Sequence, residues 1–106
     1  MQKGVNMLLY EIRKKTGEIP YKKRKEIKEG VTLELEGDSV LIQSFVLKEE
    51  AIKKLKEFKS EVREMHYSGT YYLIEEYFIE ENLYDSTGEF ISSGDIVDFS
   101  KMDFNF

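Results

Sequence analysis

Carboxylates are the residues of this chain with the widest choice of chemistry, and they gather in its last third. Residues 67–106 carry nine Asp and Glu against a single basic residue, Lys101. Carboxylates that converge can bind a hard divalent cation, serve as general acid and base, or dock on a basic protein surface. Their spacing matches no EF-hand loop, and neighbouring acids on a strand, such as Glu75 and Glu76, point to opposite faces. We therefore predict no metal site and no catalytic residue, and we assign these groups to solubility and partner contact.

Other reactive residue types are scarce. The chain has no Cys and a single His, His66, which excludes disulfides, thiolate chemistry and Cys- or His-rich metal centres. The sequence contains neither a glycine-rich phosphate-binding motif nor a G-x-S-x-G nucleophile motif. His66 is expected at a helix C-terminus, where the helix dipole favours a protonated imidazole. We predict a protein that is not an enzyme and needs no cofactor, with a small hydrolase using the C-terminal carboxylates as the second alternative.

Basic residues gather at the opposite end of the chain. Residues 1–30 carry a net charge of +5, residues 67–106 carry −8, and the whole chain carries −5. Thr16 and Gly17 suit a hairpin turn, which would bring two basic clusters side by side. Such a patch could follow a phosphate backbone, so nucleic-acid binding is the first alternative function, or it could guard a sheet edge against aggregation. The patch comprises Arg13, Lys14, Lys15, Lys22, Lys23, Arg24 and Lys25.

Strands are expected to position the basic clusters. Alternation of apolar and polar residues predicts strands over residues 5–13, 19–29, 31–36 and 40–46. The second of these is ambiguous, because Pro20 and Gly30 also suit the ends of a short helix, although its apolar stripe is thin for a packed helix. The last is apolar on both faces, which indicates a covered, central strand.

A helix and a hairpin are expected to follow. Ala51, Leu55, Phe58, Val62 and Met65 recur at helical spacing, which predicts a helix over residues 48–65. A long strand over residues 70–84, a turn at 85–88, a short strand from 89 to 92, a turn at 93–95 and a last strand at 96–99 come next. Residues 100–106 show little pattern and are expected to be loosely ordered.

These elements predict one α+β domain over residues 1–106. We expect an antiparallel sheet of five or six strands with one helix packed on one face, in the order β-β-β-β-α-β-β. The length suits one domain and not two. No apolar run approaches the roughly 20 residues of a membrane helix, and the chain shows neither an export signal nor a cysteine. We therefore expect a cytoplasmic protein that does not contact a membrane.

One helix leaves much of the second sheet face open. Large apolar side chains of residues 70–84 fall on both strand faces, which indicates either a β-bulge that changes the alternation or a surface for a partner. We expect a small protein-binding domain, an adaptor or inhibitor such as a phage or mobile element carries, that uses its acidic, aromatic-rich C-terminal hairpin. Self-association into a homodimer is a further alternative, with opposite charges at the two ends fixing the contact. The predicted contact residues are Tyr71, Tyr72, Glu76, Phe78 and Glu80.

Overall fold

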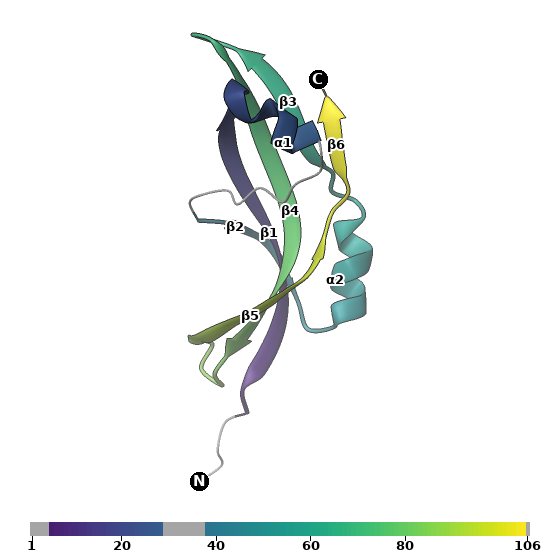
Figure 1. Cartoon of the computed structure of the whole chain (residues 1–106). Helices are drawn as coiled ribbons and strands as arrows, with labels where there is room; N and C mark the ends of the chain where they lie inside the picture. Colours follow the sequence, from purple (N-terminus) through teal and green to yellow (C-terminus); the bar gives the residue numbers. More distant parts are fainter. Residues whose placement is uncertain (1–4, 29–37, 106) are drawn as a thin grey trace.

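A computed structural model describes residues 5–28 and 38–105 (Figure 1). The elements are β1 (Met7–Pro20), a 3₁₀ turn η1 (Tyr21–Lys23), α1 (Arg24–Lys28), β2 (Val40–Phe45), α2 (Lys48–Leu55), β3 (Ser60–His66), β4 (Thr70–Tyr84), β5 (Phe90–Phe99) and β6 (Met102–Asn105). The α+β class is therefore confirmed, with two short helices where one was expected and with a mixed sheet where an antiparallel one was expected.

Two long strands form the centre of the sheet. β1 and β4 pair antiparallel over their whole shared length, from Met7 opposite Tyr84 to Pro20 opposite Tyr71. β2 lies outside β1, while the other side of β4 is shared by β3 at one end and β5 at the other. β6 runs parallel to β3, because the chain returns from β5 along the same side of the sheet. One half of the sheet therefore has the order β2-β1-β4-β5 and the other half has β1-β4-β3-β6.

Two separate hydrophobic clusters lie on opposite faces of this sheet. Ile12 opposes Ile79, and Ile19 opposes Tyr72 further along the same ladder. Ile12 and Ile19 are an odd number of residues apart, so the two pairs point to opposite faces. Helix α2 covers the first pair, and α1 covers the second through one buried side chain. Figure 1 shows α1 near the upper end of the sheet and α2 lower down. The first cluster is Ile12, Ala51, Leu55 and Ile79; the second is Ile19, Ile27, Val62, Tyr72 and Ile74.

The predicted helix over residues 48–65 is wrong in its second half. Helix α2 ends at Leu55, and residues 60–66 form strand β3 beside β4. In β3, Ser60 and Val62 are buried whereas Arg63 is exposed, which is the two-residue alternation of a strand. The backbone groups of β3 bond to β4, so tertiary pairing overrides the helical spacing of the apolar residues.

The predicted hairpin at Thr16 and Gly17 is also wrong. β1 continues straight through both residues, because β4 offers a partner at every position as far as Pro20. Residues 19–29 do not form a returning strand: the described part ends β1 and then forms η1 and α1. The predicted strand at 31–36 lies outside the described residues.

The C-terminal hairpin was predicted closely, with two corrections. Strand β4 and the turn at 85–88 are confirmed: Gly88 has φ of +88°, and the Asp85 carboxylate accepts hydrogen bonds from the backbone N–H groups of Thr87 and Glu89 at 2.8 and 2.9 Å. The predicted turn at 93–95 is wrong, since β5 passes through it with shifts of register against β4. The sequence also predicted no element after residue 99, whereas residues 102–105 form β6.

The described chain is long and narrow. Its principal extents are 62 × 24 × 21 Å and its radius of gyration is 16.7 Å. A compact protein of this length has a radius of gyration of about 13 Å. The described chain is therefore more extended than a compact domain of its length, and its buried core is divided into two clusters of five and four residues.

Candidate interaction surface on the uncovered half of the sheet

One face of the β2-β1-β4-β5 half-sheet has no helix over it among the described residues. Residues opposite each other in a ladder share a face. The pairing therefore places Leu41, Arg13, Phe78 and Phe99 in one row across the four strands, and Ser44, Glu11, Glu80 and Ile96 in the next. Helix α2 packs on the opposite face, and Ile27 of α1 packs at the other end of the molecule. We call these rows, together with Asn82, Tyr84 and Phe90, the open face.

A buried carboxylate lies at the centre of the open face. Glu11 is 1% exposed, and its carboxylate accepts hydrogen bonds from the Arg13 guanidinium, from the Tyr84 hydroxyl and, at 3.0 Å, from Asn82 Nδ2. Arg13 is held in turn by Ser39, with Nε donating to Oγ at 2.6 Å and Nη2 to the backbone oxygen at 3.1 Å. These donors compensate the carboxylate for its lost hydration.

The same contacts decide what this cluster can do chemically. Because Glu11 accepts from three side chains and lies out of reach of solvent, it is not placed to take a proton from a substrate. The phenol of Tyr84 has its pKa raised, chiefly because it donates to Glu11 and further because burial disfavours phenolate. Asn82 also donates to Glu80 at 3.0 Å. The cluster therefore joins β1 to β4 and holds the two central strands in register.

Apolar side chains lie on both outer strands of the open face. On β5, Phe90, Ile96 and Phe99 are 55%, 46% and 50% exposed. Cross-strand ring pairs hold two of them in place: Phe99 lies 6.2 Å from Phe78 and Phe90 lies 5.8 Å from Tyr84, between ring centroids. On β2, Leu41 is 47% exposed. Grouped exposed side chains of this kind are typical of a surface that meets another molecule.

The two outer strands also have unprotected backbone edges. Within the described chain, β5 pairs only with β4, and β2 pairs only with β1. Exposed edges in natural sheets are usually guarded by lysine, proline or very short strands. Neither β2 nor β5 contains a basic residue or a proline, and β5 is ten residues long. Both edges can therefore accept a further strand.

The predicted contact residues occupy different environments. Tyr71 points to the side of β4 away from the open face. The side of the open face carries the other four residues, Tyr72, Glu76, Phe78 and Glu80. Tyr72 is 0% exposed and Phe78 is 5% exposed, so neither presents surface to a partner. Burial raises the pKa of Glu76, an effect that the charge of Lys15 opposes.

The predicted basic patch is divided by the straight course of β1. Lys14 lies in the middle of the sheet, with Nζ 3.7 Å from a carboxylate oxygen of Glu75 and 5.6 Å from the ring centroid of Tyr77. Arg13 belongs to the buried cluster. Lys22, Lys23 and Lys25 are exposed, but they lie beyond the end of β1. Arg13 thus pairs with Glu11 of β1, and Lys14 pairs with Glu75 of β4. In the described part of the chain, no hairpin brings them beside the second basic cluster.

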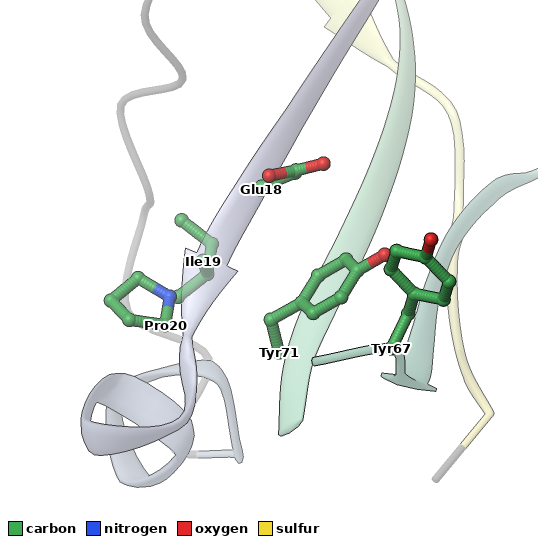
Figure 2. Close-up of a pocket in the computed structure, with 5 residues that line it drawn as sticks. All are labelled: Glu18, Ile19, Pro20, Tyr67 and Tyr71. Carbon is green, nitrogen blue, oxygen red and sulfur yellow. The ribbon is translucent and has the colours of Figure 1, made fainter. Parts of the chain in front are cut away.

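His66 and the hollow at the tip of the molecule show no catalytic arrangement. His66 lies at the end of β3 and not at a helix end, with Nδ1 3.2 Å from Thr70 Oγ1 and Nε2 3.4 Å from Glu64, so the expected helix-capping role is wrong. An open hollow of 480 Å³ is lined by Glu18, Ile19, Pro20, Tyr67 and Tyr71, among which Glu18 is the one carboxylate. Figure 2 shows the rings of Tyr67 and Tyr71 close together and Glu18 further along its strand. No group of three or more His, Asp or Glu placed to hold a metal occurs in residues 5–28 and 38–105.

Comparison with protein-family models, curated proteins and solved structures finds no match to this chain. In the described part of the chain, no helix is long and apolar enough to cross a membrane.

The residues that sequence reasoning missed are those of β5. Phe90, Ile96 and Phe99 were assigned to two short strands around a turn, which hid the fact that they form one edge. The available signal was the run from residue 90 to residue 99, which has no Lys, Arg or Pro. Glu11 and Asn82 gave no signal, since nothing in their local sequence indicates burial.

Proposed function

We propose that this chain is a small protein-binding domain, without catalytic activity, whose C-terminal hairpin receives an extended segment of another protein along strand β5. The observation that carries the proposal is the exposure of β5: nine of its ten residues are exposed, although the strand is regularly paired on its inner side. A bound strand would pair with the free backbone groups of β5. Either an adaptor or an inhibitor can work in this way.

The side chains of β5 indicate the composition of the bound segment. Phe90, Ile96 and Phe99 offer apolar area on the open face, where alternate residues of the added strand would lie. Asp95 and Asp98 are exposed on the same strand, with no basic residue between positions 90 and 99. A positive charge on the partner raises its rate of encounter with these aspartates, and the aspartates repel acidic partners. A segment that alternates apolar residues with Lys or Arg therefore fits best.

Synthetic peptides of about seven residues can test this proposal. A peptide alternating Val and Lys should shift the amide resonances of β5 and slow their hydrogen exchange, while one alternating Val and Glu should do neither. The variant Asp95→Lys with Asp98→Lys should weaken binding of the Lys peptide by about tenfold or more.

The matched control is Glu49→Lys with Glu50→Lys, which makes the same change of net charge on the exposed first turn of α2. If this control weakens binding as much as the β5 variant, the effect is one of overall charge and the assignment to β5 is wrong. Shifts confined to another strand would likewise overturn it.

A further inference from the structure

In the described part of the chain, strand β2 pairs on one side only, with β1, so the prediction of a covered, central strand is wrong and β2 is a second free edge beside β5. Five of its six residues are exposed, and Val40, Leu41 and Ile42 are 64%, 47% and 40% exposed. Its sequence, Val-Leu-Ile-Gln-Ser-Phe, has no charged residue. An uncharged, apolar edge of this composition associates readily with another strand.

We propose that a second copy of this chain occupies this edge, with β2 pairing antiparallel to β2 of the second copy about a two-fold axis. A strand without charge neither repels its own copy nor selects a charged partner. In β5, by contrast, antiparallel self-pairing would bring Asp95 and Asp98 toward their copies, which is unfavourable. A two-fold contact requires one patch that is complementary to itself, and β2 meets this requirement.

The residues that flank β2 carry opposite charges. Asp38 precedes the strand and Lys48 follows it, and both side chains are exposed. With the two-fold axis at Gln43, Asp38 of one copy approaches Lys48 of the second copy, and the same contact occurs twice. Val40 then lies opposite Val46 of the second copy, and each valine is 64% exposed in the single chain. Charge and apolar surface therefore agree on one register.

The resulting dimer would also bring the two α2 helices to one side. A two-fold axis perpendicular to the sheet keeps the same face of both copies on the same side. The strand order becomes β5-β4-β1-β2 followed by β2-β1-β4-β5 of the second copy. Leu47, which is 53% exposed at the start of α2, would line the seam between the copies. Both β5 edges stay free, so this contact is independent of partner binding at β5.

The solution mass of the full chain tests the dimer. Light scattering should give twice the chain mass of 12.5 kDa. Ile42→Lys, which places two ammonium groups near the axis, should reduce the mass to 12.5 kDa while circular dichroism shows a folded chain. Ile91→Lys is the matched control, because it makes the same change on β5 at a residue of similar exposure, 46% against 40%, and should leave the dimer intact.

A charge exchange tests the register. Asp38→Lys should weaken the dimer by about tenfold, through two repulsive contacts with Lys48. Adding Lys48→Asp should restore the original dissociation constant, whereas a purely structural effect of the first change would persist.

The natural absence of cysteine allows a third test. Of single cysteines placed at Ile42, Gln43 and Ser44, at least one should form a disulfide-linked dimer under mild oxidation, since paired residues lie about 5 Å apart and disulfides need similar Cα separations. Ser92→Cys on β5 should not. A monomeric wild type, for instance because the chain covers β2 with its own residues, would overturn the proposal, as would linkage at Ser92 alone.

Discussion

Glu11 shows how a single charged residue is made compatible with the interior of this small sheet. Its carboxylate is satisfied by Arg13, Asn82 and Tyr84, donors from both central strands. Removing one donor leaves the others in place, whereas removing the acceptor takes a partner from three donors at once, of which Asn82 is buried and Arg13 and Tyr84 are partly buried. Since an unsatisfied buried group loses its full hydration, the acceptor should matter more than any one donor.

Glu11→Ala should therefore lower the free energy of unfolding by about 3 kcal/mol, while Tyr84→Phe should lower it by about 1 kcal/mol. Urea denaturation of the two variants beside the wild type measures both values. Equal losses for the two variants would show that the carboxylate is not the centre of the cluster.

The hydrogen bond from Tyr84 also makes a part of the stability depend on pH. The pKa of the phenol is raised above its ordinary value of about 10, chiefly because the phenol donates a hydrogen bond to Glu11 that phenolate could not make. Above that value the unfolded chain releases the proton while the folded chain keeps it. The contribution of this hydrogen bond to the free energy of unfolding is therefore complete below pH 10, and it decreases as the pH rises through the pKa of Tyr84 in the folded chain. The difference in stability between wild type and Tyr84→Phe should be constant at neutral pH and smaller above pH 10.

Ionisation of Glu76 should lower the stability of the folded chain, whereas ionisation of a paired carboxylate raises it. Burial raises its pKa above 4.5, so stability decreases as the pH rises through the folded pKa, and the ionised form is unfavourable at neutral pH. Glu76→Gln should increase the free energy of unfolding at neutral pH by roughly a few tenths of a kcal/mol, because solvent and Lys15 already offset part of the effect. Glu75→Gln is the control, since Glu75 lies 3.7 Å from Lys14 and 3.9 Å from Arg63 and should gain nothing.

At the scale of elements, the sequence predicts secondary structure correctly where the local residue pattern favours the same element that pairing in the sheet produces. The abundance of Tyr, Phe and Ile over residues 70–84 and the turn at Asp85 predicted β4 and its hairpin, because both signals depend on neighbours in the chain. The spacing of Phe58, Val62 and Met65 predicted helix, yet β3 forms there because β4 has a free side to pair with. β1 passes through Gly17 for the same reason. Such pairings depend on distant residues and cannot be read from a local window.

The candidate surface could be predicted only in part. The hairpin was located, but the exposed residues belong to its outer strand, and burial removed Tyr72 and Phe78 from the contact set. Which of two alternating faces is covered depends on where the short helices pack, and a strand pattern that is apolar on both sides does not contain that information.

Gly94 determines how closely β5 can approach β4. A Cβ at this position would lie 2.6 Å from the backbone oxygen of Glu81, closer than atoms can pack. Gly94→Ala should therefore displace β5, lower the free energy of unfolding by about 1–3 kcal/mol and speed hydrogen exchange at Asn82 and Leu83. Ser93→Ala, on the exposed neighbouring residue, should change neither quantity. An unchanged exchange rate in Gly94→Ala would show that β5 does not need this approach.

At the scale of the whole molecule, the two clusters on opposite faces should behave as two separate units of stability. They share the strands β1 and β4 but no core residue. Ile27→Ala removes a buried side chain from one cluster and Leu55→Ala from the other, each at a cost of about 2–5 kcal/mol. Ile27→Ala should speed amide exchange mainly in β3, and Leu55→Ala mainly in β2 and β5, because each cluster holds the elements around it. If either change speeds exchange equally at both ends, the long central strands transmit the loss and the protein unfolds as one unit. Separate behaviour would instead mean that a contact along β2 or β5 stabilises that half of the sheet and leaves the half with α1, β3 and β6 unaffected.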